Sequence, residues 1–210
     1  MKYIEKLQYI THDIPHLTHI EQAQNACEAG AKWIQYRCLT KADDELLKDI
    51  NAIAEICDDW GTTLIVTNHI HLFGKADIQG FHIEDMDADF TSIREKVGDD
   101  ITLGGSANTI ENLIRLAKSG VDYAGFGPFS ITETKPNDYP LITIEQYRST
   151  IKELKALNIT LPVLAVGGVK TYDVEALMQT GIYGIAVSGA INFADDFIEA
   201  YQDFYDAVRG

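Results

Sequence analysis

Segments typical of β-strands and of α-helices alternate along the whole chain, and no other feature of the sequence constrains the fold more. Short runs rich in β-branched and aromatic residues predict eight strands, and amphipathic runs that begin at capping residues separate them. The predicted strands are 7–11, 31–38, 62–68, 79–83, 101–106, 121–128, 161–169 and 182–191. Such alternation is typical of a parallel sheet, in which each helix returns the chain to the same end of the sheet.

Capping residues and glycines predict where the helices begin and end. Three stretches fit the capping-box pattern at a helix start: Thr18 with Glu21, Asn108 with Glu111, and Thr143 with Gln146. Asp43 or Asp44 is expected to cap the helix that stops at Gly61. A short, weak helix is expected before strand 79–83, another short one over 174–181, and a terminal helix from about residue 195.

Eight β/α units without a linker or a break in composition predict one domain, residues 1–210, with a closed (β/α)8 TIM-barrel fold. The stretches 63–66 and 161–166 are apolar throughout, as expected for strands buried on both faces. A doubly wound open sheet is the alternative. Both architectures gather ligands at the C-terminal ends of the strands, so candidate site residues are sought there.

The overall charge excludes some classes of partner. A net charge of −15 disfavours binding to nucleic acid, and an anionic ligand requires a local positive site. No apolar run is long enough for a membrane span, and the first residues do not form a signal peptide. Cys27, Cys38 and Cys57 have no paired spacing, which predicts buried free thiols and a cytoplasmic protein.

The stretch from Gly125 to Pro136 predicts an anion site, because its glycines precede two hydroxyl groups and an ammonium group. The last two predicted strands strengthen this prediction. Their glycine-rich ends lie where many barrels bind a phosphate group through backbone N–H groups. The expected phosphate ligands are Thr132, Thr134, Gly167, Gly168, Val187 and Ser188.

The strand ends on the other side of the predicted barrel carry further polar residues. Gln35, Thr67 and Ser106 lie at strand ends, and Arg37 with Lys135 could hold a second anionic group. Asn68 and Asp87 could hold Mg²⁺ on that anion. The alternatives are that Arg37 only pairs with an Asp at the barrel rim and that Asp87 is a turn residue.

The histidines receive no functional role from the sequence. His12, His16 and His19 match no zinc-ligand spacing, so solvent-exposed or capping roles are expected for them. His69 and His71 flank a strand end and could touch a ligand. His82 lies inside a predicted strand and is expected to belong to the core.

An ordered set of motifs resembles the thiamine phosphate synthase family over about residues 7–191. The set comprises Gln-x-Arg at 35–37, the Asp after the fourth strand, Gly-Pro-Phe with Thr-Glu-Thr-Lys over 127–135, Ala-Val-Gly-Gly-Val at 165–169 and Val-Ser-Gly-Ala-Ile at 187–191. The resemblance implies a (β/α)8 barrel that joins hydroxymethylpyrimidine diphosphate to a thiazole phosphate and releases pyrophosphate with Mg²⁺.

The resemblance also implies roles for individual residues. Gln35, Arg37, Ser106 and Lys135 would bind the pyrimidine diphosphate, with Arg37, Ser106 and Lys135 as catalytic residues and Asp87 as a metal ligand. The residues implied for the thiazole phosphate are Thr132, Thr134, Gly168, Val187 and Ser188. In the implied mechanism the C–O bond to diphosphate breaks early, and the thiazole nitrogen captures the resulting cation. The implied partners are small phosphorylated substrates, and a homo-oligomer is left open.

Three positions depart from the family pattern. Leu39 stands where the family has a lysine, Asn68 where it has an aspartate, and Glu84 where it usually has a glycine. Losing a cation and a carboxylate is expected to weaken binding of a diphosphate with Mg²⁺. Two alternatives therefore stay open. One is a non-catalytic protein that binds thiazole phosphate or thiamine phosphate, and the other is a thiazole tautomerase, although Ser106 stands near the strand end where that activity needs a histidine.

Overall fold

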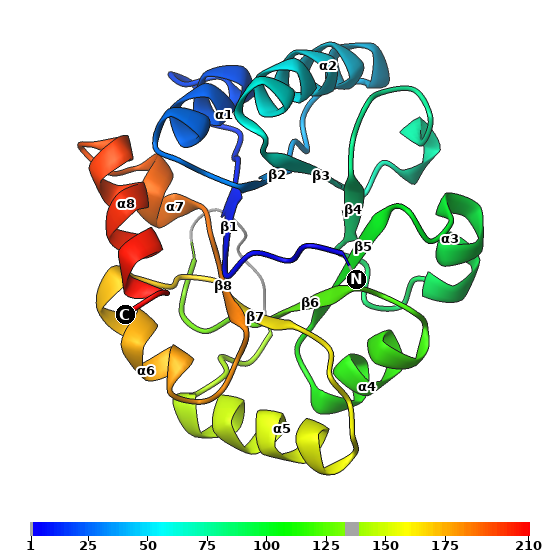
Figure 1. Cartoon of the computed structure of the whole chain (residues 1–210), viewed down its shortest axis with the longest axis vertical. Coiled ribbons are helices and arrows are strands. Elements are labelled where there is room, and N and C mark those ends of the chain that lie inside the picture. Colours follow the sequence, from blue (N-terminus) through cyan, green and yellow to red (C-terminus); the bar gives the residue numbers. More distant parts are fainter. Residues whose placement is uncertain (1, 133–138) are drawn as a thin grey trace.

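Eight parallel strands close into a barrel in the computed structural model, which describes residues 2–132 and 139–210 (Figure 1). Each strand pairs with its neighbours in sequence, and the last strand pairs with the first. The strands are β1 (Leu7–Ile10), β2 (Trp33–Tyr36), β3 (Thr63–Thr67), β4 (Gly80–Ile83), β5 (Thr102–Ala107), β6 (Tyr123–Phe126), β7 (Val163–Val166) and β8 (Gly184–Val187). The barrel prediction is confirmed, and the open sheet is wrong.

Helices surround the barrel on its outside (Figure 1). They are α1 (His19–Glu28), α2 (Asp43–Trp60), α3 (Phe90–Val97), α4 (Ile110–Lys118), α5 (Ile144–Ala156), α6 (Val174–Met178), α7 (Gly189–Asn192) and α8 (Phe197–Ala207), with 3-10 turns η1 (Ile70–Leu72) and η2 (Thr171–Asp173). The capping boxes at Thr18 and Thr143 are confirmed. The one predicted at Asn108 is wrong by one position, because Thr109 pairs with Asn112 instead.

Two other boundary predictions are wrong for local reasons. Ala42, without a side-chain cap, precedes α2, whereas Asp43 and Asp44 lie in its first turn, where carboxylates favour the positive end of the helix dipole. The predicted strand 182–191 is shorter, because the backbone leaves the extended conformation at Ser188 and α7 begins.

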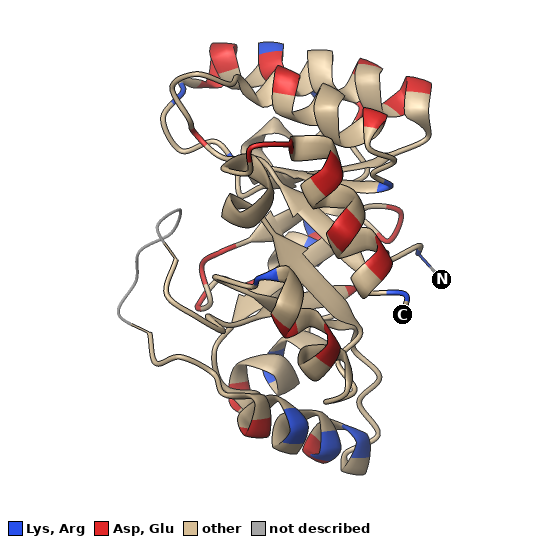
Figure 2. Cartoon of the chain, turned by 90° about the vertical axis from the view of Figure 1, so that its left-hand side faces the viewer, with Lys and Arg blue, Asp and Glu red and all other residues tan. Residues whose placement is uncertain are grey.

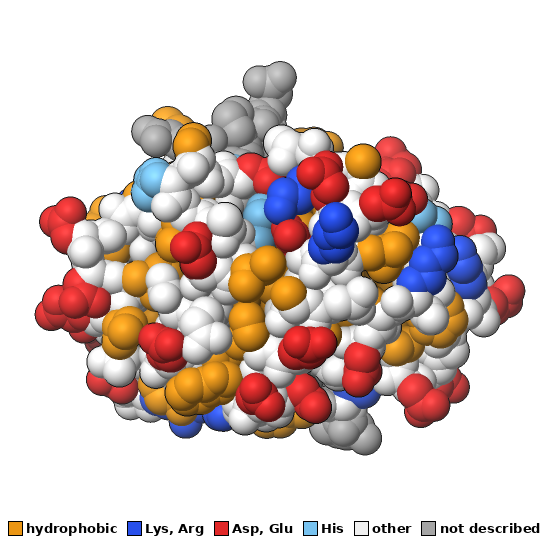
Figure 3. Space-filling view, turned by 90° about the horizontal axis from the view of Figure 1, so that it is seen from above, with side chains coloured by type: hydrophobic (Ala, Val, Ile, Leu, Met, Phe, Trp, Pro, Cys, Tyr) orange, Lys and Arg blue, Asp and Glu red, His pale blue; other side chains and the backbone are white. Residues whose placement is uncertain are grey.

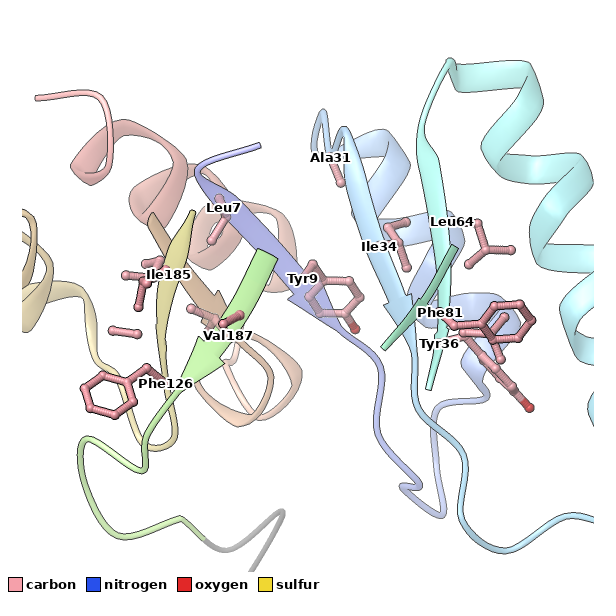
Figure 4. Close-up of a cluster of buried hydrophobic side chains, with 14 of the residues drawn as sticks. Leu7, Tyr9, Ala31, Ile34, Tyr36, Leu64, Phe81, Phe126, Ile185 and Val187 are labelled. Carbon is pink, nitrogen blue, oxygen red and sulfur yellow. The ribbon is translucent and has the colours of Figure 1, made fainter. Parts of the chain in front are cut away.

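Alternate residues of each strand face the helices and the barrel interior. The outward side chains form a cluster under the helices, which includes Leu7, Tyr9, Ile34, Phe126 and Ile185 (Figure 4). A second, smaller cluster fills the interior with Ile4, Ile10, Trp33, Ile65, Tyr123, Leu164 and Ala186. Glycine makes room for it: a Cβ on Gly104 would lie 2.2 Å from the Tyr123 ring. The interior cluster fills the barrel below the C-terminal ends of the strands, so space for a ligand remains at those ends.

The segment before β1 passes across the N-terminal end of the barrel (Figure 1). The Lys2 ammonium forms an ion pair with Asp122 at 2.8 Å, and the Tyr183 hydroxyl donates to the Ile4 carbonyl. Ile4 belongs to the interior cluster, so this segment covers the end of the barrel that carries no site.

Acidic side chains are spread over the outer helices. The positions of Asp and Glu are red on several turns of the outer helices in Figure 2, and their side chains alternate with apolar ones over the face shown in Figure 3. Asp195, Asp196, Asp203 and Asp206, in and just before α8, are all exposed to solvent. Among the described residues, no helix is both long and apolar enough to span a membrane.

Candidate functional site

A cavity of about 470 Å³ opens at the C-terminal ends of the strands. Every strand except β3 contributes a lining residue, either from the strand itself or from the loop that follows it. The lining residues that the sequence had predicted are Gln35, Arg37, Ser106, Thr132, Gly167, Gly168, Val187 and Ser188. Residues from distant parts of the chain thus meet around one space.

Three other predicted site residues, Thr67, Asn68 and Asp87, do not line the cavity. Thr67 lies behind Gln35, whose side-chain amide donates to the Thr67 hydroxyl at 2.8 Å. Thr134 and Lys135 fall outside the described residues, so their assignment stays a prediction.

A turn of two glycines forms part of the cavity wall beside β6 and β7. Gly167 and Gly168 have positive φ angles of 92° and 69°. The β6 loop packs directly on this glycine turn, because the N–H groups of Phe129 and Ser130 donate to the carbonyl oxygens of Val166 and Gly167 at 2.9 and 2.8 Å. A Cβ on Gly168 would lie 2.6 Å from the Ile131 carbonyl oxygen, so a side chain there would push the two loops apart.

Ser188 follows the last residue of the neighbouring strand β8 and directly precedes the short helix α7. The Asn192 amide donates to the Ser188 Oγ at 3.1 Å and to the Ile10 carbonyl oxygen at 3.2 Å. These bonds fix the start of α7 against β1. A turn of two glycines next to the start of a short helix is a common phosphate-binding arrangement in this fold.

The side of the cavity formed by β2 and β4 carries charged side chains. Arg37 is buried, and its guanidinium group contacts the Glu84 carboxylate at two points, 2.8 Å from Nε and 3.4 Å from Nη2. The Glu84 backbone N–H donates to the Asn68 Oδ1 at 3.0 Å. One alternative from the sequence was that Arg37 only forms an ion pair with an aspartate at the barrel rim. The partner is instead Glu84, one of the departures from the family pattern.

A chain of hydrogen bonds crosses the floor of the cavity. The Gln8 amide donates to the Tyr123 hydroxyl at 3.1 Å, and His82 lies between Tyr123 and Ser106, with Nδ1 3.1 Å from the hydroxyl and Nε2 3.0 Å from the Ser106 Oγ. Burial raises the pKa of Tyr123, so its hydroxyl stays protonated. His82 is buried, as expected, but it lines the cavity and makes polar contacts.

Sequence reasoning missed His82 as a site residue, although a signal was present. Residues two apart on a strand face the same side. His82 is two residues from Glu84, and both line the cavity. The two-residue spacing from Glu84 could therefore have placed the His82 imidazole at the cavity.

Gln35 offers a further polar group to a ligand. Its side chain is buried, and its Oε1 has no hydrogen-bond partner among the described residues. A buried carbonyl oxygen without a partner is costly, so a donor on a bound molecule would stabilise it.

Oxygen ligands suited to a hard cation lie on the loops after β3 and β4. Asn68 provides an amide oxygen, which accepts from the Glu84 N–H, and the Asp87 side chain is 97% exposed and lies 3.8 Å from Arg115. Mg²⁺ commonly binds through one or two such groups together with substrate phosphates, so the donor set fits that ion.

The remaining candidates lie outside the cavity. Leu39 is exposed, and Lys41 forms an ion pair with Asp49 at 2.5 Å on α2. His71 lies 2.9 Å from Asp43, and His69 lies 3.3 Å from the Cys38 carbonyl oxygen. None of these side chains lines the cavity. The expected solvent or capping role is wrong for His19, which is buried and bonded to Asp13 and Thr11.

The family model and the curated relatives agree on one family. The family described as thiamine monophosphate synthase matches residues 7–191. The thiamine-phosphate synthase of Phocaeicola vulgatus is 37% identical over 191 residues, which cover 91% of this chain and 92% of that protein. The thiamine-phosphate synthase of Bacteroides thetaiotaomicron is 36% identical over 190 residues, 90% and 91% of the two chains. A solved structure of thiamine phosphate pyrophosphorylase from Pyrococcus furiosus shares the fold, with a TM-score of 0.85, 24% identity and coverage of 97% and 95%.

Proposed function

The chain belongs to the thiamine monophosphate synthase family, and we propose that the cavity at the end of its barrel is where the transfer reaction of that family takes place. The protein is a transferase that joins a pyrimidine diphosphate to a thiazole phosphate. The observation that carries the placement is the meeting of eight sequence-predicted residues around one cavity.

The thiazole phosphate is assigned to the glycine side of the cavity. Gly167 and Gly168, which have no side chain, line the cavity together with Ser188 and Thr132. Backbone N–H groups beside a helix start favour a phosphate group without a buried side-chain cation. This matters for a chain with a net charge of −15, whose overall field repels anions.

The pyrimidine diphosphate is assigned to the opposite side. Gln35 Oε1 is a suitable acceptor for the amino group of the pyrimidine ring, since it has no other described partner. Arg37 supplies positive charge to the diphosphate, and its guanidinium has donors beyond those directed at Glu84. Lys135, outside the described residues, is kept as a second cation on the sequence pattern alone.

The hydrogen-bond chain gives Ser106 a directed hydroxyl. The Gln8 amide donates to Tyr123, and we assign the Tyr123 proton to the bond with His82 Nδ1, so that His82 Nε2–H donates to the Ser106 Oγ. The Ser106 proton is then free to point at a ligand oxygen. We place that oxygen on the diphosphate, where the hydroxyl would stabilise developing negative charge.

The reaction needs no nucleophile from the protein. The bond between the pyrimidine methylene carbon and the diphosphate oxygen breaks, and its electron pair leaves on pyrophosphate. The thiazole nitrogen then forms the new C–N bond with its own electron pair. The protein holds both reactants in one cavity, and Arg37 and Ser106 stabilise the leaving group.

Mg²⁺ is the proposed cofactor, held by Asn68 and Asp87, and when bound it would neutralise diphosphate charge. We also propose that the protein acts in the cytoplasm on small phosphorylated molecules, which agrees with three buried cysteines that form no disulfide.

The test is pyrophosphate release by the purified protein with both substrates, with and without Mg²⁺. We expect Mg²⁺-dependent release that falls at least about 100-fold in Ser106→Ala and Lys135→Ala combined, since each removes a group that stabilises charge. Ser149→Ala, on the exposed face of α5, is the matched control. Binding of thiazole phosphate without release would instead support the non-catalytic alternative.

A further inference from the structure

Three metal-ligating side chains meet beside the cavity but do not line it: Asp13, His19 and Cys38. The His19 Nε2 lies 2.9 Å from the Asp13 Oδ1, and the Cys38 thiol donates to the same oxygen at 3.2 Å. The three ligand atoms all lie within 4.8 Å of one another. His19 and Cys38 are buried, and Asp13 is half-buried, so solvent reaches one side of the cluster.

Neighbouring groups already orient two of these ligands. The His19 Nδ1 lies 2.7 Å from the Thr11 Oγ1, which directs the other ring nitrogen at Asp13. The Leu39 N–H donates to the Asp13 Oδ2 at 3.0 Å, and the Thr40 hydroxyl donates to Oδ1 at 3.1 Å, so both oxygens of this carboxylate are held in place beside His19 and Cys38. Metal-binding histidines in proteins are usually held in this way by a hydrogen bond to the second ring nitrogen.

We propose that Asp13, His19 and Cys38 form a binding site for Zn²⁺, with water as the fourth ligand. Ideal zinc bond lengths place tetrahedral ligand atoms roughly 3.3 to 3.7 Å apart, so the Asp13 contacts need to open by only about 0.4 Å. One sulfur, one imidazole nitrogen and one carboxylate oxygen suit Zn²⁺ better than Mg²⁺, which prefers oxygen ligands. The thiol loses its proton to solvent on binding.

The site would connect three segments that surround Arg37. Asp13 lies on the loop after β1, His19 begins α1, and Cys38 directly follows Arg37. The Arg37 backbone N–H donates to the Thr11 Oγ1, the same oxygen that contacts His19. Bound zinc would therefore stiffen the backbone that carries Arg37. This inference stands on geometry alone and does not depend on the proposed reaction.

The experiment titrates the chelator-treated full chain with Zn²⁺ and, separately, with Co²⁺ as a spectroscopic probe. We expect one equivalent of metal per chain, a thiolate-to-cobalt charge-transfer band and a rise in Tm with Zn²⁺. Because no cysteine is among the residues that line the cavity, metal bound there would not produce this band.

Variants test the ligands. Cys38→Ser should abolish the charge-transfer band, and Asp13→Asn should weaken Co²⁺ affinity at least about tenfold while keeping the band. Cys57→Ser, a buried thiol on α2, and Asp43→Asn, from an exposed Asp–His pair, should match the wild type. Failure of the wild-type chain to show the band and the Tm rise would overturn the proposal, as would persistence of the band in Cys38→Ser. The wild-type measurements suffice if a variant does not fold.

Discussion

The two sides of the cavity differ in the residues that line them. The β6 to β8 side includes Gly127, Gly167 and Gly168, where an added Cβ would lie 2.1 to 2.8 Å from a neighbouring atom, so we call it the glycine side. On the β2 to β4 side the surface consists of polar and charged side chains that bind one another, with Arg37 on Glu84 and Gln35 on Thr67. All three departures from the family pattern, Leu39, Asn68 and Glu84, lie on or near the side-chain side. The glycine turn is held by backbone hydrogen bonds and close packing, whereas the side chains on the other side can exchange hydrogen-bond partners when a ligand binds.

The largest loss of activity is expected from Gly168→Ala, which disrupts the glycine turn. Its Cβ would lie 2.6 Å from the Ile131 carbonyl oxygen, and φ is 69°, so the turn and the β6 loop must move apart. A displacement of about 1 Å can cost on the order of 100-fold in rate. We expect that loss in kcat/KM, mainly through KM for the thiazole phosphate, in steady-state kinetics.

Gly61→Ala is the matched control for this prediction. Gly61 has a similar φ of 59°, but a Cβ there meets nothing within 4 Å, and it lies beyond the far end of α2. Both variants carry the backbone strain of a left-handed alanine, so both should lose stability. Equal losses of activity in the two would mean that strain, rather than the contact with the β6 loop, is responsible.

Arg37→Gln tests the charged side and is expected to rank next. It removes a cation from the leaving group while the Glu84 carboxylate stays at the cavity, so kcat/KM should fall by roughly 50-fold. KM for the thiazole phosphate should change little. Arg148→Gln, which alters an exposed pair with Glu145 on α5, is the control. A main effect on the thiazole phosphate would contradict the assignment of the two sides.

The difference between the two sides also explains what could be predicted from the sequence. The barrel and the Gly167 to Gly168 turn were predictable, because strand order and close backbone approach depend on local residue types. The pairing of Arg37 with Glu84 was not, since it joins residues 47 positions apart whose separation depends on the register of β2, β3 and β4. The same holds for Cys38 and Asp13, which are 25 positions apart.

Glu84→Gly is expected to improve binding of the pyrimidine diphosphate on the charged side of the cavity. The Glu84 carboxylate lies at the cavity, where it repels a diphosphate and occupies part of the Arg37 guanidinium. Removing one negative charge near an anion is worth roughly 1 kcal/mol at an effective dielectric constant near 20 to 40, which is about fivefold in affinity. KM for the pyrimidine diphosphate should fall by about that factor in steady-state kinetics.

Glu84→Gln separates charge from position. It keeps an oxygen that can accept from Arg37 but carries no charge, so it should give about the same decrease in KM. An increase in KM in both variants would show instead that the carboxylate is needed to hold Arg37 in place.

The smallest effect is expected from Thr67→Val, which breaks a side-chain contact one layer behind the cavity. The variant keeps the shape of Thr67 but removes the acceptor for the Gln35 amide, so Gln35 can rotate and misplace the oxygen assigned to the pyrimidine. One neutral hydrogen bond contributes roughly 0.5 to 1 kcal/mol, so KM for the pyrimidine diphosphate should rise about two- to threefold, with kcat nearly unchanged. Thr63→Val, at the other end of β3, should leave both constants unaltered. Because Gln35 lies on β2, on the side-chain side, an equal rise in KM for the thiazole phosphate would show that the two sides of the cavity are not independent.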